Sequence, residues 1–305
     1  MTDKNNMDLI KRIQSMKSDF SKGQKLIAKY ILDHYDKAAF MTAARLGKVV
    51  GVSESTVVRF AMELGYDGYP KLQKALQELI RNKLTSVQRM EIASSRIGDQ
   101  DILKTVLQSD IEKIRLTLEE IDKEEFKNII ETILKARKIY ILGVRSSAAL
   151  ASFLGFYFNL LFDNVRLVHT TSVSEMFEQI LRVGPDDVVI GISFPRYSRR
   201  TVKALQYASK QGSKVIAVTD SYLSPLTEYA THTIIARSDM ASFVDSLVAP
   251  LSVINALIVA IVMRKKEEVF KTFNDLEQIW DEYQVYEKYH DEEMMDEEEI
   301  MDENE

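Results

Sequence analysis

The chain has 305 residues and no cysteine. The absence of thiols excludes a disulfide scaffold, thiolate metal sites and cysteine nucleophiles, and it fits a reducing compartment. The opening residues, MTDKNNMDLI, lack the long apolar core of a signal peptide. We therefore expect a cytoplasmic protein, and we expect neither a metal nor a cofactor.

Long apolar runs are also scarce. The most apolar stretch, residues 246–263, is broken by a proline and by polar residues up to Asn255, so its uninterrupted part covers only residues 256–263. A membrane-spanning helix needs about 20 predominantly apolar residues. The stretch is therefore predicted to be a buried core helix.

Charge is distributed unevenly along a chain whose net charge is −6. Residues 1–83 hold 15 Lys and Arg against 9 Asp and Glu, a net charge of +6, and the remainder is at −12. Residues 291–305 contain ten acids and no base, which is typical of a disordered tail. The positive net charge of the amino-terminal part indicates that residues 1–83 bind a polyanion.

The hydrophobic pattern changes at about residue 126. Residues 1–83 have helical periodicity, and residues 84–125 are predicted to be a helical linker with a polar break at residues 94–99. In residues 126–270 short β-rich runs alternate with helical segments, and residues 271–305 are predicted to form a C-terminal helix and the acidic tail. The β-rich runs are residues 138–142, 165–168, 188–193, 214–219 and 232–236.

These runs lack strict alternation and are separated by helices, which indicates a parallel sheet covered on both faces. The predicted fold is therefore an all-α domain followed by an α/β domain with a doubly wound, five-stranded parallel sheet.

The most specific pattern is that of a helix-turn-helix at residues 41–69. Thr42 can cap a first helix, Gly51 allows a left-handed turn, and Ser53 can cap a second helix. Gly47 has no side chain and so lets the two helices cross closely. The predicted core is Leu46, Val50, Val52, Val57, Phe60 and Leu64.

The outer face of the second helix would then enter the major groove. Arg59 can reach guanine or phosphate, and lysines around the motif can contact the DNA backbone. A two-helix corner in an ordinary helical domain is the alternative, but the spacing, the two caps and the basic surroundings together favour DNA binding. The expected contacts are Thr42, Lys48, Ser53, Glu54, Ser55, Thr56, Arg59, Tyr69 and Lys71.

Two loops that follow β-rich runs have the composition of anion sites. Residues 140–150, YILGVRSSAAL, form a strand–loop–helix unit that aims backbone N–H groups at an anion. Residues 193–201, SFPRYSRRT, repeat the arrangement after the third run. If those two strands are neighbours, both loops open into one crevice.

Neither loop has the glycines of a dinucleotide fingerprint or of a Walker A motif. One loop alone is equally well interpreted as a capped helix N-terminus with exposed arginines. Two such loops at corresponding strand ends favour a shared ligand site.

These motifs resemble those of the RpiR (MurR/RpiR) family of bacterial transcription regulators, over about residues 4–270. The family joins an N-terminal helix-turn-helix domain to a C-terminal SIS (sugar isomerase) domain. GVSESTVVRFAMELGYDGY, residues 51–69, is close to the family pattern GVS-x-x-T-V-x-R-F-x-x-x-L-G-x-x-G-Y. The resemblance implies domains at residues 1–83 and 126–270 and a flavodoxin-like strand order.

SIS domains bind phosphosugars through a G-x-G-x-S loop and an S-x-S-G-x-T loop, which residues 143–147 and 193–198 resemble. Arg145 and Arg196 replace glycines of these patterns. Residues 171–177 resemble the family segment that faces the sugar. The resemblance thus implies a phosphosugar site made of Gly143, Arg145, Ser146, Ser147, Ser174, Glu175, Ser193, Arg196, Tyr197 and Ser198.

Arginine favours planar, bidentate recognition of phosphate or carboxylate. We therefore hypothesise that the effector carries more negative charge than a simple hexose monophosphate, as a phosphorylated sugar acid or a sugar with a second phosphate would. The alternative is that the two arginines form salt bridges across a dimer interface.

A sugar-phosphate aldose–ketose isomerase is the competing interpretation, because Glu175 could act as its base. Of the four histidines only His169 could reach the crevice, and an isomerase does not need a helix-turn-helix. A ligand-free scaffold is a third interpretation. We favour a regulator with no catalytic residues, a homodimer or homotetramer in which a phosphosugar changes the affinity for a double-stranded DNA operator.

Overall fold

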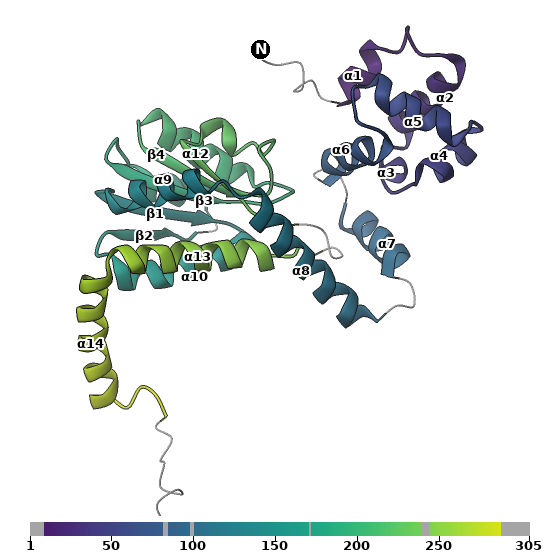
Figure 1. Cartoon of the computed structure of the whole chain (residues 1–305). Coiled ribbons are helices and arrows are strands. Elements are labelled where there is room, and N and C mark those ends of the chain that lie inside the picture. Colours follow the sequence, from purple (N-terminus) through teal and green to yellow (C-terminus); the bar gives the residue numbers. More distant parts are fainter. Residues whose placement is uncertain (1–8, 82–84, 98–100, 171, 239–243, 288–305) are drawn as a thin grey trace, which may run out of the picture.

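The computed structural model describes residues 9–81, 85–97, 101–170, 172–238 and 244–287. A helical amino-terminal part and an α/β part lie at opposite ends of the connecting helices α7 and α8 (Figure 1). The acidic stretch predicted to be a disordered tail lies outside the described residues.

Helices α1 to α6 of the amino-terminal part pack around one hydrophobic core, in which Ile13, Ile27 and Phe60 are fully buried. α2 begins at a capping box, since Ser21 N donates to Gln24 Oε1 over 2.8 Å and Gln24 N donates to Ser21 Oγ over 3.4 Å. The bounds are α1 (Leu9–Ser15), α2 (Lys22–Asp33), α3 (Tyr35–Ala38), α4 (Ala43–Val50), α5 (Glu54–Glu63) and α6 (Tyr69–Arg81).

Two helices connect this part to the sheet. α7 continues through Ser94 and Ser95, so the polar break predicted there is wrong for these residues, and residues 98–100 lie outside the described ones. Ile92 of α7 packs against the amino-terminal core. The bounds are α7 (Ser86–Ile97) and α8 (Ile102–Glu120).

The α/β part is built on a five-stranded sheet in the order β2-β1-β3-β4-β5, and all neighbouring strands are parallel. The predicted fold class and strand order are therefore confirmed. The strands are β1 (Lys138–Gly143), β2 (Val165–Val168), β3 (Asp187–Ile192), β4 (Lys214–Thr219) and β5 (His232–Ile235).

Helices cover both faces of the sheet, which is why its central strands are apolar on both sides. In β1, Ile139 and Ile141 pack into a cluster with α9, α10 and α13, whereas Tyr140 and Leu142 face α11 and α12. The helices are α9 (Lys123–Leu134), α10 (Ser147–Leu161), α11 (Val173–Ile180), α12 (Arg199–Lys210), η1 (Thr227–Tyr229), α13 (Val248–Arg264) and α14 (Lys266–Glu282).

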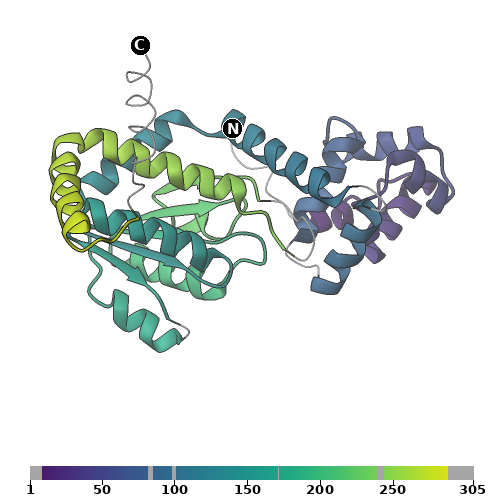
Figure 2. The same ribbon diagram turned by 90° about the horizontal axis from the view of Figure 1, so that it is seen from below.

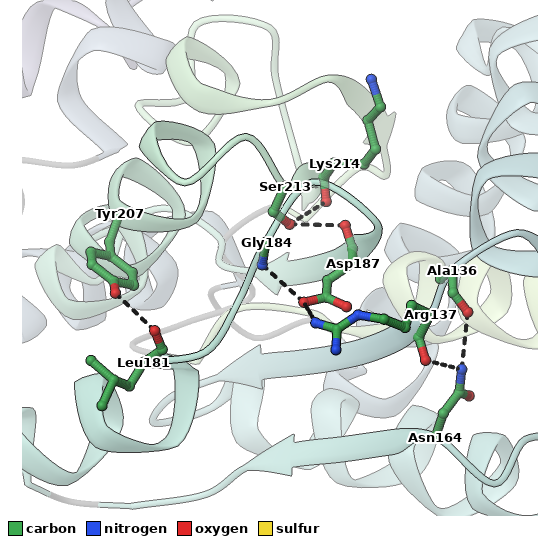
Figure 3. Close-up of polar contacts among 9 residues, drawn as sticks. All are labelled: Ala136, Arg137, Asn164, Leu181, Gly184, Asp187, Tyr207, Ser213 and Lys214. Carbon is green, nitrogen blue, oxygen red and sulfur yellow. Dashed lines mark hydrogen bonds and ion pairs between the residues drawn. The ribbon is translucent and has the colours of Figure 1, made fainter.

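The amino ends of the central strands are fastened by polar contacts around Asp187, which is fully buried (Figure 3). Its carboxylate accepts hydrogen bonds from Arg137 Nη2 over 2.7 Å and from Gly184 N over 2.9 Å, and its carbonyl accepts one from Ser213 Oγ over 3.0 Å. Both carboxylate hydrogen bonds go to Oδ2, and Oδ1 has no hydrogen-bond partner among the described residues. In a doubly wound sheet a ligand binds at the opposite edge, at the carboxyl ends of the strands.

The apolar stretch near residue 250 forms α13, which buries Val253, Leu257 and Ile261 and lies beside α10, as Figure 1 and Figure 2 show. This confirms the predicted core helix. Within the described residues no single helix is long and apolar enough to cross a membrane; α13 and α14 pass that test only together, across a bend of 99°.

Candidate functional site

Helices α4 and α5 form the predicted turn. Thr42 Oγ1 accepts a hydrogen bond from Arg45 N over 3.2 Å, and Ser53 Oγ accepts one from Thr56 N over 3.3 Å, so both helices have a side-chain N-cap. Gly51 lies between them with a φ of 78°, a left-handed conformation that favours glycine.

Close approach of the two helices depends on Gly47. A Cβ at this position would lie 2.8 Å from the carbonyl oxygen of Val52, nearer than real Cβ atoms come to such an atom. Of the predicted core residues, Leu46, Val57, Phe60 and Leu64 are buried, and Val50 and Val52 are partly buried.

The opposite face of α5 is open to solvent. Glu54, Ser55 and Arg59 are exposed. At the start of the helix, Ser53 Oγ lies 2.9 Å from Ser55 Oγ and 2.8 Å from Thr56 Oγ1, so three hydroxyls are gathered there. A guanidinium beside hydroxyls on an exposed helix is the arrangement that reads base edges and phosphates in a major groove.

A hollow of about 680 Å³ lies beside this face. Its second wall is the start of α2, with Ser21, Gly23 and Gln24. Sequence reasoning did not identify this wall, because α2 precedes the motif and packs onto it only in the folded chain. The residues from the motif that line it are Val52, Ser53, Thr56, Arg59, Met62 and Glu63.

The other expected DNA contacts divide into two groups. Lys48 and Lys71 are exposed. Tyr69 is only 3% exposed and donates a hydrogen bond from its hydroxyl to the carbonyl of Met41 over 2.8 Å, so the expectation that it contacts DNA is corrected. Burial raises the pKa of Tyr69 to about 12. Its hydroxyl ties the start of α6 to the end of α3 and to the segment between α3 and α4.

The two anion loops lie side by side because β1 pairs directly with β3, with Gly143 opposite Ile192. Together they line a hollow of about 290 Å³, here called the small hollow. They also line a neighbouring one of about 570 Å³, the large hollow. The loop residues of the small hollow are Val144, Arg145, Ser146, Ser147, Ser193, Phe194, Pro195, Arg196 and Ser198.

The large hollow extends toward the end of β2 and the start of α12. Arg145 and Arg196 line it as well as the small hollow. Its other residues are Gly143, Val144, Ala148, His169, Thr170, Tyr197, Ser198, Arg199 and Arg200. His169 thus reaches the crevice, as the sequence analysis allowed.

The backbone explains why the family pattern has glycine at two of these positions. Arg145 has a φ of 57° and Arg196 a φ of 66°, both left-handed. Gly143 has another reason to be glycine, since a Cβ there would lie 2.4 Å from the carbonyl oxygen of Ser147. Close packing of α10 on β1, rather than a turn, requires that glycine.

The serines of the loops have different surroundings. Ser147 and Ser193 are each 4% exposed, and Ser193 Oγ accepts a hydrogen bond from Ser198 N over 3.1 Å, which holds the second loop closed on itself. Ser198 caps α12 by accepting from Thr201 N over 3.3 Å. Ser146 is exposed and its side chain makes no cap hydrogen bond.

The segment expected to face the sugar lies farther out. Ser174 Oγ donates to Glu178 Oε1 over 2.8 Å, and Glu175 accepts a hydrogen bond from Thr170 Oγ1. Thr170 lines the large hollow. Glu175 is therefore one residue removed from that hollow, and Ser174 points to its own helix.

Two further contributors come from outside the predicted loops. Arg89 of α7 and Asp245 both line the small hollow, with Val244 and Leu247 beside them. No local sequence pattern marks them, because they meet the loops only through the tertiary fold.

Comparison with known proteins now identifies both parts. Residues 7–83 match the helix-turn-helix domain of the rpiR family, and residues 132–260 match the SIS domain. The amino-terminal part is a helix-turn-helix domain of the rpiR family, here called the rpiR domain. The α/β part is a SIS domain.

An uncharacterized HTH-type transcriptional regulator of Haemophilus influenzae is 25% identical to this chain over 270 residues, which cover 86% of this chain and 92% of the relative. The sugar isomerase domain of an RpiR transcription factor from Sphaerobacter thermophilus is 29% identical, with a TM-score of 0.55, over 59% of this chain and 99% of that one.

The Vibrio vulnificus NanR protein complexed with ManNAc-6P shares the fold. It has a TM-score of 0.55 and 22% identity to this chain, and the likeness covers 89% of this chain and 97% of that one.

Proposed function

We propose that this chain is a DNA-binding regulator whose SIS domain senses a phosphorylated sugar or sugar acid and thereby changes its affinity for an operator. The observation that carries the proposal is that two loops rich in hydroxyl and guanidinium groups line shared hollows at the carboxyl ends of β1 and β3. Helix N-termini and arginines together suit a phosphate dianion. The ManNAc-6P bound to the NanR neighbour supports this ligand class.

The charge around the large hollow favours a ligand with more than one anionic group. Arg145, Arg196, Arg199 and Arg200 all line it. One phosphate neutralises only part of this charge, and a carboxylate would neutralise more. Calorimetric titration tests this with 6-phosphogluconate, which has a carboxylate at C1, and with glucose 6-phosphate, whose C1 is uncharged. Tighter binding of glucose 6-phosphate would contradict it.

The alternative of an isomerase is kept because His169 lines the large hollow and Glu175 accepts a hydrogen bond from Thr170 of the same hollow. We favour a sensor, since a helix-turn-helix serves no step of isomerisation. Incubation with aldose and ketose phosphates tests the choice. Turnover that disappears in Glu175→Gln would establish an enzyme.

We further propose that the protein is a homo-oligomer, because two rpiR domains that bind one operator must be held together by an interface between copies of the chain. α8 exposes an apolar stripe at a spacing of three and four residues, which no part of the described chain covers. The stripe consists of Leu103, Leu107, Ile111, Ile114 and Leu118, which are between 38% and 69% exposed. We assign it to contact with a second copy.

The experiment that tests the whole proposal measures operator affinity with and without effector. Operator DNA is first selected from random double-stranded fragments by binding to the full-length protein. Fluorescence anisotropy then measures the dissociation constant in the presence of ManNAc-6P, 6-phosphogluconate or neither. A change of about tenfold or more is expected for one of these ligands. An identical constant in all three conditions would exclude sensing of these phosphosugars.

A further inference from the structure

The small hollow contains an ion pair that joins two distant parts of the chain. Arg89 of α7 donates through both terminal nitrogens to the carboxylate of Asp245, with Nη1 at 3.4 Å from Oδ2. The arginine is only 1% exposed, and the aspartate side chain is 14% exposed. A buried guanidinium needs an anionic partner, and here the partner is the one acid among the lining residues of the small hollow.

α7 touches the loops of the hollow at a second point. Arg196 Nη1 donates to Ser86 Oγ over 3.0 Å. About two turns further along the same helix, Ile92 packs against the core of the rpiR domain. α7 therefore contacts the SIS hollow with one end and the DNA-binding domain with its middle.

The segment that carries Asp245 also holds the other connecting helix. Ser246 Oγ donates to Asp110 Oδ1 of α8 over 2.6 Å. Asp110 lies 3.4 Å from Nζ of Lys113, a lysine that is only 3% exposed. Both connecting helices are thus fastened to residues 244–247, of which Val244, Asp245 and Leu247 line the small hollow.

We infer that Arg89 of α7 joins Arg145 and Arg196 as a third arginine that binds the ligand in the small hollow, and that an effector anion takes the place of Asp245 as its partner. This inference rests on the proposed function, since it requires a phosphorylated ligand in the small hollow. The change of partner moves α7 relative to residues 244–247. Because Ile92 is packed into the rpiR domain, the movement reorients that domain and alters operator affinity.

The charges of the hollow make such an exchange favourable. Three arginines, Arg89, Arg145 and Arg196, face a single carboxylate. Removing one partner of a buried pair is strongly destabilising, but a phosphate supplies a replacement with up to two charges and oxygens placed for bidentate contact. Repulsion between the ligand and Asp245 then favours release of the aspartate from the arginine.

The two partners should therefore respond to substitution in opposite directions. Asp245→Asn removes the competing carboxylate and is expected to tighten binding of ManNAc-6P or 6-phosphogluconate about tenfold in calorimetry. Arg89→Met is expected to weaken it about tenfold. A purely structural ion pair predicts weaker or unchanged binding for both variants.

A double-mutant cycle separates partner exchange from a general effect of charge. In the Arg89→Met background, Asp245→Asn should change ligand affinity by no more than about threefold, because Asp245 no longer competes with the ligand for Arg89. The matched control is Arg264→Met, which removes an arginine paired with Glu131 over 2.7 Å on the surface of the SIS domain. It should leave ligand affinity unchanged.

Operator binding reports whether the movement of α7 reaches the rpiR domain. With full-length protein, the ratio of operator dissociation constants with and without ligand should fall to within about twofold of unity in Asp245→Asn. Binding of DNA itself should persist. If Arg89→Met does not fold, as judged by thermal unfolding, Arg89→Lys replaces it and should also weaken ligand binding, because lysine lacks the bidentate fork.

The outcomes distinguish this inference from the function on which it rests. If the wild-type protein binds neither ligand, the sensor function fails and the inference with it. If it binds one of them but Asp245→Asn weakens or does not change that binding, the exchange is refuted while the sensor remains.

Discussion

Arg145 and Arg196 share one uncommon backbone conformation, with φ values of 57° and 66°, in two loops that line the same hollows. A left-handed conformation costs an L-residue about 1–2 kcal/mol, and glycine avoids most of this cost. Strain of this kind gathers at functional sites, where the side chain contributes something that glycine cannot. Here that contribution is a guanidinium at each hollow.

Replacing these arginines by glycine should separate stability from binding. Arg145→Gly and Arg196→Gly relieve the backbone strain, so the melting temperature should stay the same or rise. Each should weaken binding of 6-phosphogluconate about tenfold, through loss of a charged hydrogen bond. Thermal unfolding and calorimetry measure the two effects.

The control is Arg166→Gly, at an exposed position of strand β2. Glycine within a strand is destabilising, so this variant should melt at a lower temperature and bind the ligand as the wild type does. Unchanged ligand affinity in both loop variants would show that the arginines do not contact the ligand.

The exposed face of α5 gives a prediction about DNA binding. Arg59→Ala removes the guanidinium beside the hydroxyl cluster and should weaken operator binding about tenfold or more, while leaving the affinity for the phosphosugar intact. Anisotropy and calorimetry measure the two affinities. Lys127→Ala, on α9 of the SIS domain, removes one exposed charge and is the matched control. Equal operator affinity in the two variants would remove α5 from the DNA interface.

The two glycines around the turn should respond differently to alanine. At Gly47 an added methyl group meets the carbonyl oxygen of Val52 at 2.8 Å, so Gly47→Ala forces the helices apart and should cost about 2 kcal/mol of unfolding free energy. At Gly51 the space is open and only the φ of 78° resists, so the cost should be about 1 kcal/mol. Urea unfolding of both variants checks the order; the reverse order would contradict this account of the turn.

Alkaline pH should destabilise the rpiR domain through Tyr69. Burial raises its pKa from 10.0 to about 12, so the folded state keeps the phenolic proton after the unfolded state has lost it. The contribution of the Tyr69 phenol to the free energy of unfolding is therefore fully present below pH 10 and declines as the pH rises toward 12. Unfolding free energies measured between pH 8 and about pH 11 should fall less steeply in Tyr69→Phe than in the wild type.

At pH 8 the same variant should be less stable by about 1 kcal/mol, because the hydrogen bonds from the Tyr69 hydroxyl to the carbonyls of Met41 and Ala38 are lost. Tyr283→Phe, at a position that is 71% exposed, should leave stability at pH 8 unchanged. If the unfolding free energy falls equally steeply with pH in Tyr69→Phe and in the wild type, ionisation of Tyr69 is not the main cause of the loss of stability at alkaline pH.

The strands and the turn were predictable because their signals are local. Buried parallel strands are continuous apolar runs, and Gly51 between two capping hydroxyls marks a turn without knowledge of its neighbours. Tyr69 shows the limit: an aromatic residue beside lysines matches a DNA contact, and only the packing of α6 against α3 and α5 reveals that it is buried. Arg89 and Asp245, 156 residues apart, have no sequence signal at all, since tertiary packing alone places them at one hollow.

The apolar stripe of α8 leads to a prediction that connects assembly with DNA binding. Leu107→Glu combined with Ile111→Glu places two carboxylates in the stripe and should convert a dimer or tetramer into a smaller species in light scattering. Operator affinity should fall more than tenfold, because two linked rpiR domains bind one operator at high effective concentration. Lys104→Glu with Gln108→Glu adds the same side chains on the same helix outside the stripe and should leave assembly intact. Monomeric wild-type protein, or an unchanged assembly in the stripe variant, would place the contact between copies elsewhere.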